Sequence, residues 1–189
     1  MDLLQILKQS FNDARSHDKK SLTKQELHMR RSARWVVSLG KRFEQEFPDR
    51  KKHRVFWKGN QRNRREFTLT EFMYDISVCE IGFVRSAAQG KQLGFIRKAI
   101  WQIESEFAKD SREALIDFSK LVAGSGQNKL FIAPVVHDEA AFLRVLREPA
   151  VHCSGNVYLA MVPKPKEWPS SADRIGLWRL EEGEWRLNR

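Results

Sequence analysis

The sequence predicts an α/β fold with a mixed central β-sheet, helices on both of its faces and a β-hairpin at the C-terminus. Residues 23–47 carry apolar side chains at helical spacing, residues 66–107 contain two extended segments, and residues 99–162 alternate between strand and helix patterns. Alternating strands and helices favour parallel strands joined by right-handed crossovers, whereas consecutive strands favour antiparallel pairing. The combination of the two patterns predicts a mixed sheet.

The first half of the chain contains two predicted helices and three predicted strands. Apolar side chains at three- and four-residue spacing predict helices over 2–12 and 23–47. A short strand over 55–57 is followed by GNQRNRR, which we expect to be a turn. Alternating side chains predict an extended chain over 66–83, and a glycine-containing connection leads to a strand over 99–107.

The second half alternates helices with strands and ends in a hairpin. Its predicted elements are a helix over 112–126, a strand over 129–136, a helix over 138–149, a strand over 156–163 and a hairpin over 174–189. A chain of 189 residues is long enough for one domain and short for two. We therefore expect a single domain over 1–189, in which an N-terminal helix and linker (1–20) precede the α/β core (23–162) and the hairpin.

The composition excludes several classes of protein. The chain has 34 Lys and Arg against 24 Asp and Glu, a net charge of +10, and 41% hydrophobic residues, which favours a folded domain with a polyanionic partner. Cys79 and Cys153 lie far apart without a CxxC motif, so neither a disulfide framework nor a zinc site is expected. No apolar run is long enough to span a bilayer, and the N-terminus lacks a secretory pattern. We expect a cytoplasmic protein without a membrane partner.

One acid-free segment, residues 50–65, holds eight of the basic side chains. They are Arg50, Lys51, Lys52, Arg54, Lys58, Arg62, Arg64 and Arg65. Lys and Arg bind phosphates, and the interleaved Phe56 and Trp57 would offer a surface on which bases stack. We predict nucleic-acid binding by this segment, and the simpler alternative is a solvated run of charge.

Three acidic side chains are candidates for a metal site. Asp75 lies in an apolar extended segment, and Glu104 and Glu106 share one face of the strand over 99–107. Carboxylates gathered on neighbouring strands are unfavourable unless a cation compensates them, and their oxygens are typical ligands of Mg²⁺ or Mn²⁺. Such a metal activates water for phosphodiester hydrolysis. Lys120, in the following helix, would stabilise the charge of the transition state.

Each of these residues also has a simpler interpretation. A Glu-x-Glu pattern on a strand is typical of a solvated face, and Lys120 taken alone is typical of an exposed helix position. Asp75 would otherwise cap a turn or form an ion pair with a cation such as Arg97. The pattern of residues alone leaves these alternatives open.

The order of elements resembles the PD-(D/E)xK nuclease superfamily, whose fold is restriction-endonuclease-like. YDISVCE, with Asp75, is similar to the strand that carries the superfamily's Asp, and QIESEF places Glu104 at the acidic position of the second motif. Glu106 stands where the commonest pattern has Lys, which makes this an E-x-E variant. Lys120 in DFSKL is similar to a lysine that the following helix supplies in such variants.

The resemblance has two further implications. It implies Mg²⁺-dependent cleavage of DNA by an endonuclease. It also implies a further metal ligand from the helix before the sheet, which would be Glu44 or Glu46.

Together, the residues and the resemblance predict a metal-dependent nuclease that hydrolyses phosphodiester bonds in DNA, with Mg²⁺ or Mn²⁺ as cofactor. The alternative is a catalytically inactive nuclease-like fold that binds DNA or assembles a larger DNA-processing or defence complex, because the E-x-K lysine is missing. An RNA-directed enzyme or binder is a third hypothesis, and the oligomeric state stays open. The predicted catalytic residues are Asp75, Glu104, Glu106 and Lys120.

Overall fold

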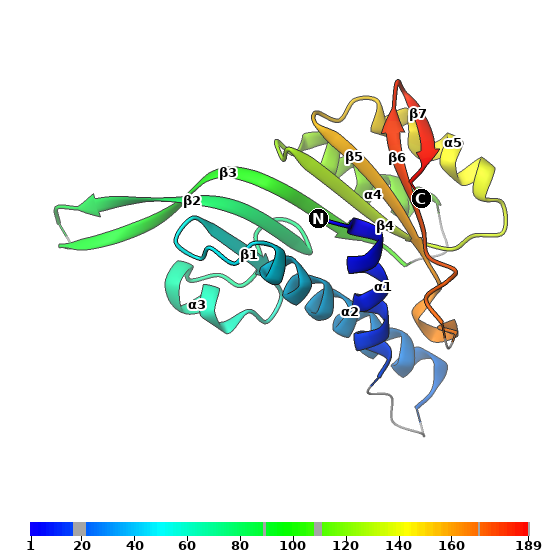
Figure 1. The fold of residues 1–189 in the computed structure, drawn as a ribbon, viewed down its shortest axis with the longest axis horizontal. Helices are drawn as coiled ribbons and strands as arrows, with labels where there is room; N and C mark the ends of the chain where they lie inside the picture. Colours follow the sequence, from blue (N-terminus) through cyan, green and yellow to red (C-terminus); the bar gives the residue numbers. More distant parts are fainter. Residues whose placement is uncertain (17–21, 89, 108–110, 170, 189) are drawn as a thin grey trace.

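The computed structural model describes residues 1–16, 22–88, 90–107, 111–169 and 171–188, and its centre is a seven-stranded β-sheet (Figure 1). The strands lie side by side in chain order, from β1 at one edge to β7 at the other. Their bounds are β1 His53–Trp57, β2 Ile76–Ser86, β3 Lys91–Ser105, β4 Asn128–Pro134, β5 Asn156–Val162, β6 Gly176–Glu181 and β7 Glu184–Leu187.

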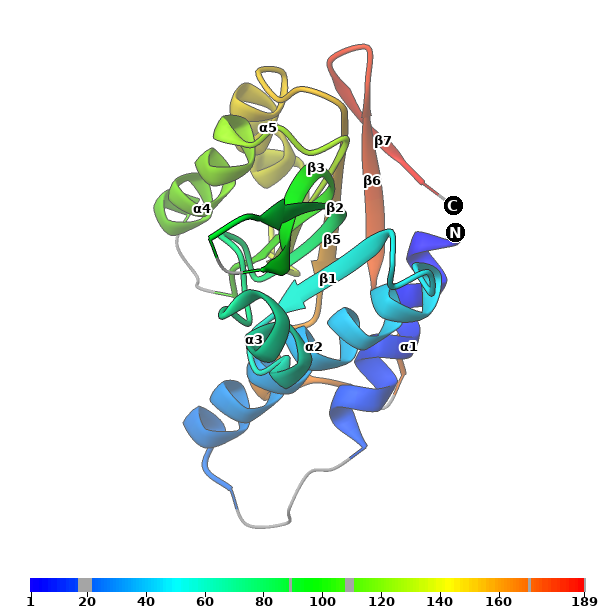
Figure 2. The same cartoon turned by 90° about the vertical axis from the view of Figure 1, so that its left-hand side faces the viewer.

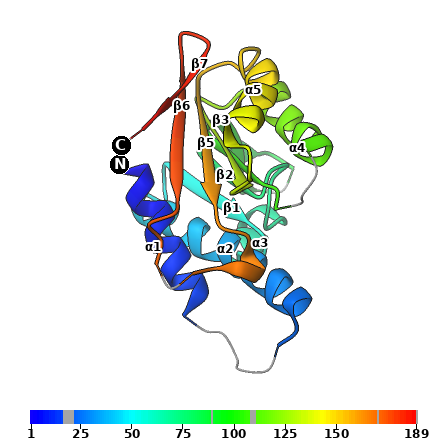
Figure 3. The same cartoon turned by 90° about the vertical axis from the view of Figure 1, so that its right-hand side faces the viewer.

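The strand directions confirm the predicted mixed sheet. β1, β2 and β3 form an antiparallel meander, β3, β4 and β5 are parallel, and β5, β6 and β7 are antiparallel. A helix lies in each crossover between the parallel strands, because a parallel pair needs a long connection. The chain ends in the predicted hairpin, formed by β6 and β7 (Figure 3).

Helices cover both faces of the sheet, as predicted (Figure 2). α1 (Leu3–Arg15) and α2 (Lys24–Glu46) pack on one face, here called the α1–α2 face. α4 (Ser111–Ala123) and α5 (Glu139–Ala150) pack on the other, the α4–α5 face. Each face has its own cluster of buried apolar side chains. The short 3-10 turn η1 (Pro165–Glu167) is followed by Trp168, which belongs to the cluster on the α1–α2 face.

Helix α2 begins at a capping box and presents an apolar stripe to the sheet. Thr23 Oγ1 accepts the backbone N–H of Glu26 at 3.2 Å, and the Glu26 carboxylate accepts the backbone N–H of Thr23 at 2.9 Å. Buried aromatic and aliphatic side chains then recur every four residues at Trp35, Leu39 and Phe43. This spacing confirms the helix predicted over 23–47.

Strand β3 begins eight residues before the predicted start at 99, and β2 runs three residues past the predicted end at 83. The first part of the predicted extended segment 66–83 is wrong, because α3 includes residues 66 and 67 and β2 begins only at Ile76. The expected glycine-containing connection is itself strand, because the antiparallel pairing runs on to Ser86 and Lys91. The side chains that follow Gly82 on β2 are mostly exposed, so no apolar alternation marks this part as strand. The 28 residues between Asp75 and Glu104 are therefore mostly the two strands of one long ribbon.

The segment GNQRNRR contains a helix, so the expected turn is wrong. α3 spans Gln61–Phe67, and Oδ1 of Asn60 accepts two backbone N–H groups of its first turn at 3.2 and 3.3 Å. Asn63 is buried and its Nδ2 donates to the carbonyl of Val55 at 2.7 Å. Polar contacts hold the start of this helix in place. Its sequence therefore lacks the apolar stripe from which an amphipathic helix is predicted.

Replacing Gly40 by Ala tests the close packing of α2 on β1. In an exposed helix this change stabilises the fold by about 1 kcal/mol. Here the added Cβ would lie 2.7 Å from Cδ2 of Trp57. Because overpacking a core typically costs about 1–3 kcal/mol, we expect the free energy of unfolding to fall by about 1 kcal/mol, measured by urea denaturation.

The matched control is Ala33→Gly, at an exposed position of the same helix. It should lose about 1 kcal/mol through helix propensity alone. A Gly40→Ala protein that is more stable than the wild type would contradict the close contact with Trp57.

Candidate active site

A small cluster of charged side chains lies where the end of β3 meets the start of β2. The antiparallel register pairs Ile76 with Ile103, so Asp75 and Glu104 are the next residues along the two strands. Oδ2 of Asp75 accepts hydrogen bonds from the backbone N–H and from Oγ of Ser105, at 3.0 and 2.5 Å. These bonds tie Asp75, which precedes β2, to the end of β3 and place its charge beside Glu104.

Glu104 is the buried member of this cluster. Its side chain is on the α4–α5 face and the residue is only 4% exposed; among the described residues, its Oε1 has no hydrogen-bond partner. Nζ of Lys120 lies 3.6 Å from that oxygen, close enough for an ion pair and too far for a hydrogen bond. Burial, and then the charge of Asp75, raises the pKa of Glu104 to about 8, although Lys120 opposes both effects.

Helix α4 supplies the positive charge of the cluster. Nζ of Lys120 forms an ion pair with Oδ1 of Asp117, one turn earlier, at 2.7 Å, and this contact raises the pKa of Lys120. The Tyr74 hydroxyl donates to the carbonyl of Lys120 at 3.1 Å and joins this part of α4 to the chain before β2. The Lys120 side chain is 48% exposed, so its ammonium group borders both solvent and the buried carboxylate.

Asp117 is a member of the site that no sequence motif predicts. Its spacing of three residues from Lys120 within a predicted helix is a signal that would have identified it, because residues three apart face the same side of a helix.

Glu106 and the two glutamates of α2 have different surroundings. Glu106 follows β3, its backbone N–H donates to the carbonyl of Ile132 at 2.9 Å, and its side chain is half-buried. Oε1 of Glu44 lies 3.5 Å from Nδ2 of Asn60, on a helix that covers the α1–α2 face, and burial raises its pKa. Glu46 is exposed. Glu44 therefore belongs to the helix that covers the face of the sheet opposite to Glu104.

The described part of the chain contains no group of three or more His, Cys, Asp or Glu side chains arranged to hold a metal ion. Asp75 and Glu104 are the predicted ligands that the structure does bring together, and Lys120 lies with them.

The ion pair considered between Asp75 and Arg97 is not formed. Asp75 is engaged by Ser105, and NH1 of Arg97 instead donates to Oε1 of Glu80 at 3.1 Å. Arg97 and Glu80 lie near each other on β3 and β2, where Glu80 is half-buried. The physical reason is the register, which sets Arg97 close to Glu80 and far along the ribbon from Asp75.

Helix α3, which contains the last three arginines of the basic segment, lies on the same side of the sheet as the cluster. Phe56 of β1 pairs with Ser77, which pairs with Gln102, so the three side chains share the α4–α5 face with Glu104. The ring of Phe67, at the end of α3, lies 5.4 Å from that of Phe56 and holds α3 against this face. The arginines of α3 therefore border the side of the sheet that carries Glu104.

Most of the predicted nucleic-acid-binding side chains are accessible. Arg54 is the exception, because it is half-buried and pairs with Glu66, which also contacts Arg62 at 3.4 Å. The exposed residues are Arg50, Lys51, Lys52, Lys58, Arg62, Arg64 and Arg65. The expected stacking surface is wrong, since Phe56 is 0% and Trp57 is 6% exposed. Pairing with β2 and packing of α2 and α3 make both rings part of the core.

A pocket of about 290 Å³ lies between the β2–β3 pair and the C-terminal end of α4. Tyr74 and Gln102 line it, Arg97 and Lys98 add positive charge, and Gly124 borders it from the chain after α4. The pocket adjoins the acidic cluster through Tyr74, whose hydroxyl also contacts the backbone of Lys120.

Comparisons with known proteins give no match: no family model fits the sequence, and neither characterised proteins nor solved structures show significant similarity. Among the helices of the described residues, none combines the length and the apolar character needed to cross a membrane.

The burial of Glu104 predicts that stability decreases as pH rises. Its raised pKa means that the folded state holds the proton more tightly than the unfolded state, so the free energy of unfolding falls between about pH 4.5 and 8. One pKa unit corresponds to about 1.4 kcal/mol, and relaxation reduces the full effect. We expect Glu104→Gln to be about 2 kcal/mol more stable than the wild type at pH 9 and similar at pH 5, in urea denaturation.

The comparison with Glu104→Gln separates this carboxylate from other groups that titrate in the same range. Glu148→Gln, at an exposed position of α5, is the control and should differ from the wild type by the same amount at both pH values. A Glu104→Gln protein whose stability changes with pH in parallel with the wild type would show that Glu104 is not the responsible group.

Proposed function

We propose that this protein hydrolyses phosphodiester bonds in DNA with Mg²⁺ or Mn²⁺, at the cluster formed by Asp75, Glu104 and Lys120. One observation carries the proposal: a buried carboxylate oxygen of Glu104 without a hydrogen-bond partner lies beside a second carboxylate and a lysine. Because burial raises the pKa of this carboxyl group to about 8, it is mostly protonated at neutral pH, and ionising it without a compensating cation is unfavourable. A buried carboxyl group at this position is explained if a ligand with positive charge binds there and favours its ionised form.

The residues of the cluster fit a divalent cation. Mg²⁺ at phosphoryl-transfer sites is usually bound by one or two carboxylates, with water and substrate phosphate oxygens completing the shell. Asp75 and Glu104 would supply the carboxylate oxygens, and Glu106, two residues beyond Glu104, is a further candidate. When bound, the cation would polarise the phosphate and lower the pKa of a water molecule.

The protein's own residues would position the reacting groups. Ser105 donates two hydrogen bonds to Oδ2 of Asp75 and so fixes this carboxylate beside Glu104. Asp117 holds the ammonium group of Lys120 close to Glu104 and leaves it in contact with solvent. From this position Lys120 would neutralise negative charge that develops on the phosphate in the transition state.

Three observations support DNA as the substrate. The net charge of +10 favours a polyanion, and the exposed arginines of α3 border the face of the sheet that carries Glu104. The antiparallel meander followed by a parallel crossover is the order of strands that the resemblance to PD-(D/E)xK nucleases implies.

We also propose a cytoplasmic location. The free thiols Cys79 and Cys153 suit this reducing compartment.

A second candidate function is binding of DNA without cleavage. Two observations favour it: Lys120 already pairs with Asp117, and the described chain has no preformed group of three metal ligands. In that case the same fold would act as a binding or assembly subunit of a DNA-processing complex.

Cleavage assays distinguish the two candidates. We expect purified protein to nick plasmid DNA with Mg²⁺ or Mn²⁺ and to lose activity in EDTA. Removing one electrostatic contact to a transition state typically lowers the rate by about 10²–10³-fold. We therefore expect Lys120→Ala to be roughly 10²-fold slower and Glu104→Gln to be at least as impaired.

The exposed variant Glu148→Gln is the matched control for Glu104→Gln and should cut at the wild-type rate. Equal nicking by the wild type and Glu104→Gln would point to a contaminating nuclease and overturn the proposal. DNA binding without metal-dependent nicking by any of these proteins would favour the binding-only function.

A further inference from the structure

The outer part of the β2–β3 pair projects from the rest of the molecule as a two-stranded arm (Figure 1). We define the arm as residues 82–88 and 90–98. β1 pairs with β2 only as far as Glu80, and β4 pairs with β3 only from Trp101 onward. Within the described chain, the two outer edges of the arm therefore have no neighbouring strand.

The arm exposes apolar side chains on both of its faces. Four of them are 40–54% exposed, and these are Phe83, Val84, Leu93 and Phe95. Each phenylalanine pairs with a glycine across the ribbon, Phe83 with Gly94 and Phe95 with Gly82. A Cβ on Gly82 would lie 2.5 Å from Cζ of Phe95, so the ring lies directly over the backbone of the facing strand. The arm is consequently thin, with one aromatic ring on each side.

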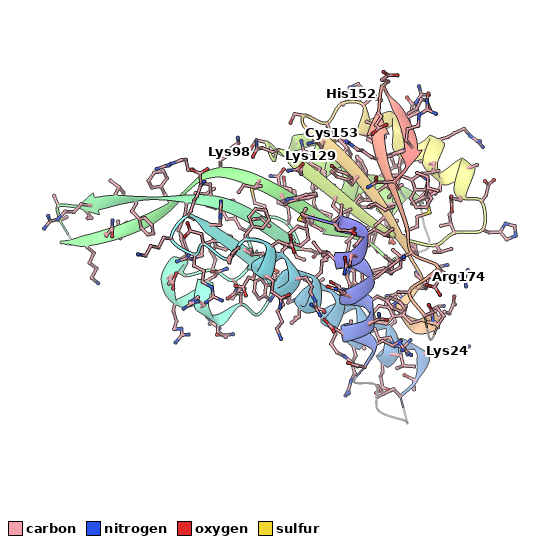
Figure 4. All side chains as sticks on the ribbon, viewed as in Figure 1. Lys24, Lys98, Lys129, His152, Cys153 and Arg174 are labelled. Carbon is pink, nitrogen blue, oxygen red and sulfur yellow. The ribbon has the colours of Figure 1, made fainter. Side chains whose placement is uncertain are left out.

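The charge on the arm is positive throughout. Residues 81–103 include no Asp or Glu, and the arm carries Arg85, Lys91, Arg97 and Lys98, the last labelled in Figure 4. Arg97 pairs with Glu80 at the base, whereas Arg85 and Lys91 lie on exposed positions towards the tip. Pairing of two arms from two copies of the chain would bring like charges together, which is unfavourable. A partner with regularly spaced negative charge is favoured.

The base of the arm packs against the basic helix α3. Phe67 of α3 lies against Gly94, where an added Cβ would be 2.8 Å from Cε1 of the ring. The arginines of α3 and the cations of the arm thus belong to neighbouring elements that pack on each other.

We propose that the β2–β3 arm inserts into a groove of duplex DNA and is a main determinant of DNA binding. The major groove is about 12 Å wide and admits a two-stranded β-ribbon. The arm has five cross-strand pairs from Gly82–Phe95 to Ser86–Lys91, a length of about 17 Å at ~3.4 Å per residue. Arg85 and Lys91 contact phosphates, and Phe83 and Phe95 pack against the sugars and base edges of the groove. This inference rests on the proposed action on DNA.

The experiment measures binding without cleavage. Fluorescence anisotropy of a labelled 20-base-pair duplex, with EDTA present and from 50 to 200 mM salt, compares the wild type with Arg85→Gln/Lys91→Gln. Each lost phosphate contact lowers the slope of log affinity against log salt by about 0.9, so the double variant should lose about 2 from the slope and bind roughly tenfold or more weakly. The matched control, Arg144→Gln/Arg186→Gln, removes two exposed cations from α5 and β7 and should retain the wild-type slope.

A second variant tests the aromatic rings. Phe83→Ser/Phe95→Ser should weaken duplex binding at least severalfold and leave the salt slope unchanged, because no phosphate contact is lost. Circular dichroism verifies that both arm variants are folded, and size-exclusion chromatography with light scattering measures their oligomeric state.

The outcomes separate this inference from the function proposed above. Wild-type binding with unaffected arm variants overturns the arm proposal alone, and the cations would then serve only to protect open strand edges from aggregation. A wild-type dimer that the arm variants convert to a monomer overturns it in favour of a second copy. Absence of duplex binding by the wild type overturns both proposals.

Discussion

The carboxyl group of Glu104 is buried at the end of β3, where its ionised form is stable only if positive charge balances it. Removal from water disfavours the charged form, and Asp75 adds repulsion. Lys120 compensates in part, with its ammonium group 3.6 Å from Glu104 and 2.7 Å from Asp117. The compensation is incomplete, because an oxygen of Glu104 has no hydrogen-bond partner among the described residues. A divalent cation would supply the missing interaction, and the proposed chemistry depends on it.

The sheet topology joins this cluster to the surfaces proposed to bind DNA. One antiparallel pair, β2–β3, carries the acidic cluster at its inner end and the basic arm at its outer end. Helix α3 packs on the same face of the sheet through Phe67 and adds exposed arginines between them. Because the acidic cluster and the arm lie at the two ends of the β2–β3 ladder, a duplex held by the arm would keep a defined position relative to Glu104.

Local patterns explain which parts of the fold are predictable. The spacing of the apolar stripe and the Thr23 capping box specify α2, and the apolar runs of β4 and β5 specify buried parallel strands. The arm and α3 are not predicted from the sequence, because the arm lacks the alternation of a half-buried strand and α3 lacks the apolar stripe of an amphipathic helix. The burial of Phe56 and Trp57 depends on strand pairing and on α2, which composition does not reveal. Asp75 and Glu104 are identifiable as residue types, but only the register of β2 on β3 brings them together.

Isothermal titration of the protein with Mn²⁺ tests most directly whether Asp75 and Glu104 form a cation site. At pH 7 we expect the wild type to bind Mn²⁺ and Glu104→Gln to bind it much more weakly. Binding should also release close to one proton, because a carboxyl group with a pKa of about 8 is mostly protonated before the cation arrives. Titration in buffers of different ionisation enthalpy measures that proton. No binding by the wild type, or equal binding by Glu104→Gln, would contradict the account.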